Sequence, residues 1–195
     1  SPWKPVQISG RNVIVLDRVY SFDNGPLPSQ IVSRGQKLFL TPPEFVLNGK
    51  PIVWGNVKFG NNYGDYAELS ADGTFEGGTA SIKGEVWFDG MFKFDMTLSP
   101  AAPLQIRSLM LGWSTPRDRA LYCMSTAWTP WKNDEIRLKG DPREYHSLFW
   151  LSGTESGLAW WCQSDANWII DPNRDNILVK RDANAARITV DLFAA

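Results

Sequence analysis

The sequence predicts an all-β fold, an antiparallel β-sandwich built as a single domain from residues 1–195. Nearly every patterned segment is short and rich in β-branched and aromatic residues, which is typical of strands. Turn residues separate these segments at regular intervals, and no long amphipathic helix alternates with them, as a parallel α/β sheet would require. No change in composition marks an internal boundary. A chain of 195 residues can also bury a core without a disulfide or a metal.

In the first half of the chain, the apolar runs predict strands at 13–19, 37–40, 52–58, 66–70, 79–88 and 92–98. The residues between these runs favour turns, because Gly and Asn tolerate a positive φ and Pro fixes φ near the value that many turns need. The expected turns are Asn24-Gly25-Pro26, Thr41-Pro42-Pro43, Asn48-Gly49, Asn61-Asn62, Asp72-Gly73 and Asp89-Gly90.

In the second half, the same reasoning predicts strands at 104–113, 120–124, 147–151, 158–163, 176–180 and 186–192. Two short aromatic runs flank a polar, glycine-bearing bend at 152–157, which is the pattern of a hairpin. Further turns are expected at Asp171-Pro172-Asn173 and Asp182-Ala183-Asn184.

The hairpin at Asp89-Gly90 can be tested by parity. A two-residue turn would place the apolar residues of its two strands on opposite faces, because a slip of one residue reverses every side chain. We therefore expect a longer loop or a bulge. The expected partners are Phe88 with Phe92, Val86 with Phe94, and Ile82 with Leu98, with Met96 on the same buried face.

The charge pattern argues against nucleic-acid and membrane partners. The formal net charge is −1, and the Lys and Arg residues are dispersed rather than gathered in a basic stripe. No apolar run approaches the roughly 20 residues of a transmembrane helix. The first residues, 1–5, also lack the apolar core of a signal peptide.

The residues that usually carry chemistry are few and scattered. The only histidine is His146, and the two cysteines, Cys123 and Cys162, lie in separate apolar runs, where inert core thiols are expected more than a disulfide. These residues do not form a zinc set. The acidic clusters at Asp134-Glu135 and at 171–175 could supply oxygen ligands for calcium, but they lack the spacing of a calcium loop and solvated turns explain them better. Gly77-Gly78 opens no helix that could hold a phosphate, so we expect no cofactor and no metal.

The ten tryptophans are the remaining unusual feature. Most are expected in the core, where large aromatic residues dominate packing; these include Trp87, Trp113, Trp150 and Trp160. Trp128 and Trp131 differ, because they lie between strand patterns beside polar residues. An indole ring can pack against the C–H-rich face of a sugar, which makes both residues candidates for carbohydrate binding. The alternatives are that the two rings hold a long loop in place or dock against another domain.

Two segments resemble a known family. Residues 148–168 read Leu-Phe-Trp-Leu-Ser-Gly-Thr-Glu-Ser-Gly-Leu-Ala-Trp-Trp-Cys-Gln-Ser-Asp-Ala-Asn-Trp, and residues 85–100 read Glu-Val-Trp-Phe-Asp-Gly-Met-Phe-Lys-Phe-Asp-Met-Thr-Leu-Ser-Pro. They are similar to the W-L-G-x-x-x-x-G-L-x-W-F-x-E-S-D-x-x-W and E-Y-D-G-M-x-x-x-x-x-L-x-P motifs in the N-terminal β-sandwich domain of family-123 glycoside hydrolases. The chain departs from the family at Gln163, where the family has Glu before Ser-Asp.

This resemblance implies a non-catalytic accessory domain of a protein that hydrolyses terminal β-linked N-acetylgalactosamine. The family's adjacent Asp-Glu pair belongs to a C-terminal (β/α) barrel, so no catalytic residue is carried over to this chain. The expected partners are that barrel and glycans, in a secreted or periplasmic system. The alternatives are a self-standing carbohydrate-binding module, a structural or docking domain, and a small hydrolase that uses Glu155 or Asp165.

Overall fold

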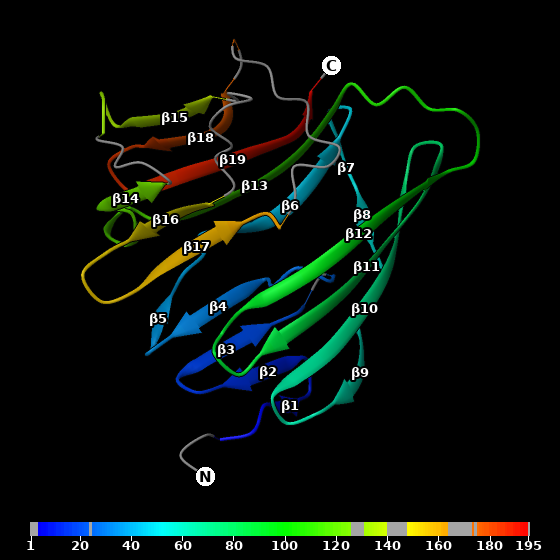
Figure 1. The fold of residues 1–195 in the computed structure, drawn as a ribbon, viewed down its shortest axis with the longest axis horizontal. Coiled ribbons are helices and arrows are strands. Elements are labelled where there is room, and N and C mark those ends of the chain that lie inside the picture. Colours follow the sequence, from blue (N-terminus) through cyan, green and yellow to red (C-terminus); the bar gives the residue numbers. More distant parts are fainter. Residues whose placement is uncertain are drawn as a thin grey trace. The chain divides into compact units, whose positions relative to one another are not determined.

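The computed structural model describes residues 4–23, 25–125, 131–139, 148–163, 173 and 175–194. It confirms the predicted fold class, because the described residues form antiparallel sheets of the kind found in β-sandwiches (Figure 1). The helical structure in these residues is one short 3₁₀ turn, η1 (Arg117–Arg119). Among the described residues, no helix has the length and apolar character needed to cross a membrane.

The chain divides into two compact units, each made from two separate segments. Unit 1 contains Ser1–Lys37 and Lys50–Gln105, and unit 2 contains Leu38–Gly49 and Ile106–Ala195. The expectation that residues 1–195 form a single domain stays a prediction.

The first sheet of unit 1 is a meander in which each strand pairs with the next along the chain. Its fold depends on tight turns, one of which places Leu16 at a φ of 44° and divides the strand expected at 13–19. The strand expected at 37–40 was largely wrong, since regular pairing ends at Lys37. The strands are β1 (Gln7–Ser9), β2 (Asn12–Val15), β3 (Arg18–Ser21), β4 (Gln30–Ser33) and β5 (Gln36–Lys37).

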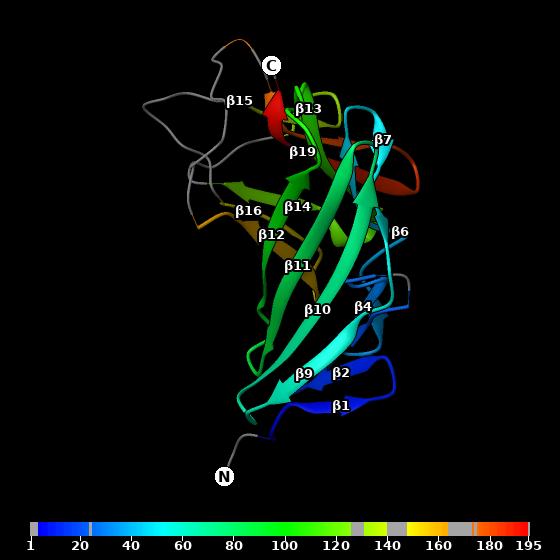
Figure 2. The same ribbon diagram turned by 90° about the vertical axis from the view of Figure 1, so that its right-hand side faces the viewer.

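The second sheet of unit 1 has the order β12-β11-β10-β8, with β9 also paired to β10. Figure 2 shows β12, β11, β10 and β9 of this sheet. Phe22, directly after β3, is fully buried and meets Phe59 and Phe92 edge-on, with ring centroids 6.0 and 5.8 Å apart. These contacts join the two sheets of the unit in one core. The remaining strands of the unit are β7 (Lys50–Pro51), β8 (Val53–Trp54), β9 (Lys58–Asn62), β10 (Tyr66–Phe75), β11 (Gly78–Trp87) and β12 (Phe92–Pro100).

The β11–β12 hairpin confirms the loop and the faces that parity predicted, but not the pairs of residues. Its loop is longer than two residues, because the Trp87 N–H donates to the Met91 carbonyl at 2.8 Å and Gly90 has a φ of 93°. The faces are as expected, but the partners are displaced by two residues, since Val86 pairs with Phe92 rather than Phe94. The β11 residues of this face are buried, whereas Phe94, Met96 and Leu98 are only half-buried.

Three predicted turns were wrong, because their residues lie in strands. Asn61-Asn62 ends β9, Thr41-Pro42-Pro43 begins β6, and Asp72-Gly73 lies inside β10. At Gly73 the reason is close packing: a Cβ there would lie 2.6 Å from the Trp54 ring. A glycine inside a strand often marks such an approach rather than a turn. The prolines lie at the start of their strand, where a missing N–H is tolerated.

The larger sheet of unit 2 has the order β15-β18-β19-β13-β6 (Figure 1). The Asn48-Gly49 turn was predicted correctly: both residues have positive φ, and the Asn48 side chain accepts the N–H groups of Arg107 and Ser108. The turn at 182–184 was also correct. The strands are β6 (Thr41–Leu47), β13 (Ser108–Pro116), β15 (Glu135–Lys139), β18 (Asp175–Arg181) and β19 (Ala185–Ala194).

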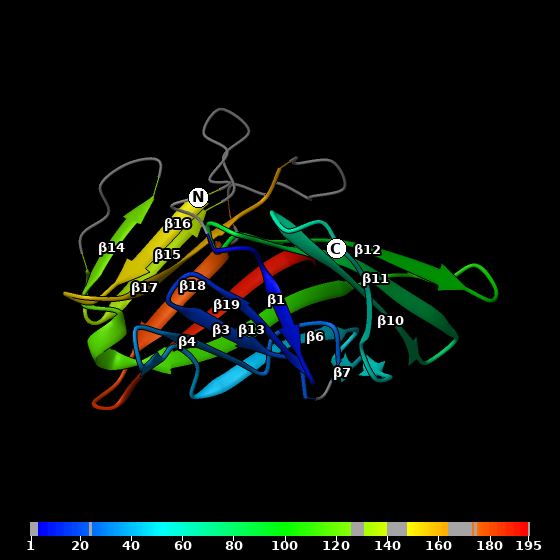
Figure 3. The same ribbon diagram turned by 90° about the horizontal axis from the view of Figure 1, so that it is seen from below.

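A smaller sheet in unit 2 contains β14 (Tyr122–Ser125), β16 (Leu148–Ser152) and β17 (Gly157–Trp161), in that order (Figure 3). Phe149 of this sheet stacks between Trp113 of β13 and Trp160 of β17, with ring centroids 6.1 and 5.9 Å away. The column of rings joins the two sheets of unit 2. The core expectation is confirmed for Trp113, which is buried, and was wrong for Trp150, which is exposed.

Candidate functional site

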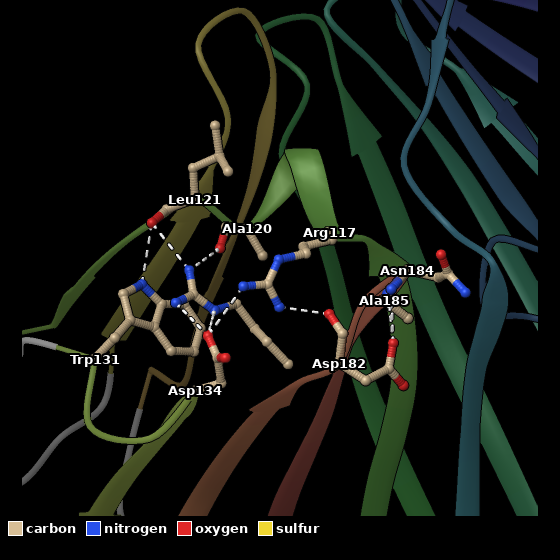
Figure 4. A network of polar contacts seen from close by, with 9 residues as sticks. Arg117, Ala120, Leu121, Trp131, Asp134, Asp182, Asn184 and Ala185 are labelled. Carbon is tan, nitrogen blue, oxygen red and sulfur yellow. Dashed lines mark hydrogen bonds and ion pairs between the residues drawn. The ribbon is translucent and has the colours of Figure 1, made fainter.

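Of the two tryptophans predicted to bind carbohydrate, the structure describes only Trp131. Trp128 lies outside the described residues. Trp131 is held on two sides. Its indole N–H donates to the Leu121 carbonyl at 3.0 Å (Figure 4), and the Arg181 guanidinium lies 3.4 Å from the centre of its ring. Groups of the protein therefore already contact one face of the Trp131 ring and its indole N–H.

Asp134 organises this cluster. Its carboxylate accepts hydrogen bonds from the Arg181 Nε and Nη2 at 3.0 and 2.7 Å, and from Arg117 at 3.1 Å (Figure 4). The bond from Arg181 is the main reason why the pKa of Asp134 lies below its ordinary value. Asp134 also follows Asn133 in a two-residue turn in which both have positive φ, the geometry that closes a tight hairpin.

The neighbouring Glu135 is also paired. It accepts hydrogen bonds from Arg137 and Lys180, and chiefly the bond from Arg137 lowers its pKa. The carboxylates of the Asp134-Glu135 cluster are thus neutralised by cations of the chain. In the part of the chain that the structure describes, no group of three His, Cys, Asp or Glu residues is arranged to hold a metal.

These contacts give Trp131 a structural role in holding the start of β15 against the residues before β14. They do not test whether the ring also contacts sugar, so carbohydrate binding by Trp128 and Trp131 stays a prediction. His146 and Asp165, and all of 171–175 except Asn173 and Asp175, lie outside the described residues. Glu155 is exposed in the loop between β16 and β17.

A second aromatic feature emerges on the smaller sheet of unit 2. Side chains alternate between its faces, and one face turns Cys123, Leu151 and Phe149 into the core. The opposite face carries large hydrophobic side chains that are 46–61% exposed: Tyr122, Met124, Trp150 and Trp161. We call these four residues the aromatic face.

The register places the aromatic face in rows across the three strands. Met124, Trp150 and Ala159 form one row, and Tyr122, Ser152 and Gly157 form the next. Trp161 extends the face along β17, opposite Leu148. Tyr122, Trp150 and Trp161 therefore lie on one diagonal, with a separation of about 7–8 Å between successive residues.

A cavity of about 520 Å³ opens on this sheet. Small residues create the hollow, since Ser152, Gly157 and Ala159 lie beside much larger neighbours. Gly157 could not be larger without movement, because a Cβ there would lie 2.4 Å from the Leu151 carbonyl. The complete lining is Tyr122, Cys123, Met124, Trp150, Leu151, Ser152, Gly157, Leu158 and Ala159.

The lining of the cavity offers groups for binding rather than for catalysis. Its lining contains no Asp, Glu, His, Lys or Arg, and burial raises the pKa of the Cys123 thiol to about 11. Cys123 is a buried thiol, as expected for a core cysteine, and neither Cys123 nor Cys162 forms a disulfide. A reactive thiol of low pKa would instead need a partly exposed position beside positive charge. The site can offer ring faces, an exposed phenol and indole N–H groups, which are the means of binding.

The aromatic face could not be predicted from Leu148–Ser152 alone. This strand has apolar residues on both faces, so its pattern does not show which side chains point to the core. The available signal lay in the neighbouring strand, where Tyr122 and Met124 alternate with Cys123 and Ser125. Combined with hairpin pairing, that alternation gives Trp150 its orientation.

Comparison with known proteins gives the chain a family. No curated protein matches it. A family model described as "Glycoside hydrolase 123, third domain" matches residues 6–166 and confirms the family that the two motifs indicated. The description numbers the domain third, which implies a parent protein of several domains. Its expected N-terminal position in that parent stays a prediction. Because the match spans most of the chain, the chain belongs to the third-domain family of glycoside hydrolase 123.

Proposed function

We propose that this chain is a non-catalytic accessory domain of a family-123 glycoside hydrolase. In this proposal a separate barrel domain hydrolyses terminal β-linked N-acetylgalactosamine, and the parent protein works in a secreted or periplasmic system for glycan degradation. The family match supports the link to glycoside hydrolysis. The role in binding or positioning rests on the chemistry of the site.

One observation carries the non-catalytic role: the lining of the described cavity contains no carboxylate. Glycoside hydrolysis commonly uses a pair of carboxyl groups on either side of the scissile bond. The two carboxylates nearest in sequence to the candidate loop are already occupied, since Asp134 binds Arg117 and Arg181 and Glu135 binds Arg137 and Lys180.

The test is turnover of aryl β-N-acetylgalactosaminide and related aryl glycosides by the purified chain. We expect no release of the aryl group above the buffer control. Turnover that Glu155→Gln or Asp165→Asn abolishes would contradict the proposal, because it would assign catalysis to a carboxylate of this chain. The exposed Asp72 provides a control, Asp72→Asn, which removes a carboxylate elsewhere.

A carbohydrate-binding module is the second candidate function. The observation that favours it is the aromatic face, because large exposed hydrophobic residues gathered on one sheet usually mark an interaction surface. The two candidates are compatible, since an accessory domain can also bind the substrate of its parent enzyme.

A further inference from the structure

We propose that the aromatic face of the β14-β16-β17 sheet is a binding site for a neutral oligosaccharide, with the diagonal Tyr122–Trp150–Trp161 as its platform. This inference rests on the proposed accessory function and adds the site and the ligand class. It places a binding surface on the sheet, and sugar contact by Trp128 and Trp131 stays a separate prediction.

The three platform residues lie on one diagonal across the sheet. Tyr122 lies opposite Ser152, two residues from Trp150, and Trp150 lies opposite Ala159, two residues from Trp161. Both steps run in the same direction across the sheet, so the three residues form a straight line of about 15 Å. A line of this length suits several linked sugar units rather than one monosaccharide.

The three platform side chains are available to a ligand. Within the described residues, the side chains of Tyr122, Trp150 and Trp161 make no hydrogen bond and no ring contact, and each residue is about half exposed or more. Trp131, by contrast, is covered by Arg181 and donates its N–H to Leu121. The platform residues therefore offer an apolar ring together with a free N–H or O–H, which matches the mixed apolar and polar surface of a pyranose.

The site is hollowed beside the platform residues. The cavity of about 520 Å³ lies among Tyr122, Trp150 and the small residues Ser152, Gly157 and Ala159. Its volume falls in the range of small-molecule sites, about 300–1,000 Å³. Gly157 and Ala159 leave room beside the rings for a sugar that extends along them.

The lining of the cavity carries no charged side chain. The lining contains no Asp, Glu, Lys, Arg or His, so it has no counter-ion for a uronate or a sulfated sugar. An anionic glycan would lose solvation at this surface without gaining an ion pair. The expected ligand is therefore a neutral glycan, which includes oligosaccharides that contain N-acetylhexosamine.

The experiment screens the full chain on an array of neutral and anionic glycans, and then titrates a soluble neutral oligosaccharide from the best hit by calorimetry. Trp150 lies at the centre of the line, where truncation costs most binding energy. We expect Trp150→Ala to weaken binding by about tenfold or more, which corresponds to about 1.4 kcal/mol. Trp161→Ala and Tyr122→Ala should each weaken it by about threefold or more, and Trp150→Phe, which keeps a ring, should restore part of the loss.

Tyr63→Ala is the matched control, because Tyr63 is an exposed aromatic residue of unit 1 that is 55% exposed. It should leave affinity unchanged. Melting temperatures of all variants show whether the fold is intact, and the Trp150→Phe titration decides the case if Trp150→Ala does not fold.

Absence of neutral-glycan binding by the chain would overturn the proposal, as would binding that Trp150→Ala and Trp161→Ala leave unchanged or a preference for anionic glycans. If Trp150→Ala instead disrupted association with another domain of the parent protein while the chain bound no glycan, the face would be a protein-docking surface and the proposal would be wrong. Each of these results leaves the non-catalytic role untouched, because that role fails only if the chain hydrolyses glycosides.

Discussion

Asp182 fixes the turn between β18 and β19 with both oxygens of its carboxylate. One oxygen accepts the N–H groups of Asn184 and Ala185, each at 2.9 Å, and the other binds Arg187. The backbone N–H of Asn184 is the main reason why the pKa of Asp182 falls to about 2. Lowering of this pKa means that the folded state prefers the ionised carboxylate.

The contribution of Asp182 to stability should therefore depend on pH. It is fully present above the ordinary carboxyl pKa of 3.8 and is lost as the pH falls through about 2. Asp182→Asn should lower the free energy of unfolding at pH 7, and its difference from the wild type should shrink between pH 4 and pH 2. Urea denaturation at several pH values measures this difference. A difference that stays constant over that range would contradict the role of the charge.

The contacts of Trp131 should stabilise the folded state. Its ring carries Arg181 and its N–H binds Leu121, so Trp131→Ala should lower the free energy of unfolding by about 2 kcal/mol, the sum of one cation–π contact and one hydrogen bond. Denaturant melts measure the loss, and Trp161→Ala is a control at an exposed ring that makes no ring contact among the described residues. A neutral Trp131→Ala that abolishes glycan retention would instead support the sugar-contact prediction for this residue.

At the scale of elements, close packing explains a glycine that resembled a turn. Gly73 lies in β10 with the Trp54 ring over it, where an added Cβ would be 2.6 Å from the ring. Gly73→Ala should therefore cost about 1–3 kcal/mol through overpacking. Gly112→Ala is the matched control, because its nearest atom would lie at an ordinary 3.7 Å. Thermal melts compare the two, and equal effects would mean that the Trp54 contact is not responsible.

The strands of the hairpins were predictable, because their β-branched and aromatic runs end at Asn48-Gly49, Asp89-Gly90 and the bend at 152–157. Parity also predicted the longer loop at Gly90. The orientation of Trp150 was not predictable from its own strand, since Leu148–Ser152 carries apolar side chains on both faces. Only pairing with Tyr122–Ser125, which alternates clearly, assigns the ring to the exposed side.

The ion pairs around Trp131 depend on contacts that are distant in sequence. Asp134 meets Arg117 and Arg181 from two other elements, and no local pattern joins these three positions. The sequence therefore predicted that the tryptophan loop lies beside acidic residues. It did not predict which cationic side chains pair with them.

At the scale of the whole molecule, the two compact units are interleaved along the chain. β6 belongs to unit 2 but lies in sequence between the two segments of unit 1. Neither unit can therefore be removed as one continuous piece of the chain. This interleaving supports the proposal that residues 1–195 fold as one domain.

Urea unfolding should accordingly show a single cooperative transition, with the same midpoint by far-ultraviolet circular dichroism and by tryptophan fluorescence. Trp54 and Trp87 report on unit 1, whereas Trp113 and Trp160 report on unit 2. Replacing Trp54 and Trp87 by Phe biases the fluorescence toward unit 2, which provides a second probe. Two separated transitions would contradict the single-domain proposal.

The most direct test of the account measures retention and hydrolysis in one tube. The chain is incubated with an insoluble neutral glycan that contains N-acetylgalactosamine; the protein left in the supernatant reports binding and the reducing ends released report hydrolysis. The account predicts that the wild type is depleted from the supernatant, that Trp150→Ala is not, and that neither releases reducing ends. Release of reducing ends by the wild-type chain, or retention that does not depend on Trp150, would contradict it.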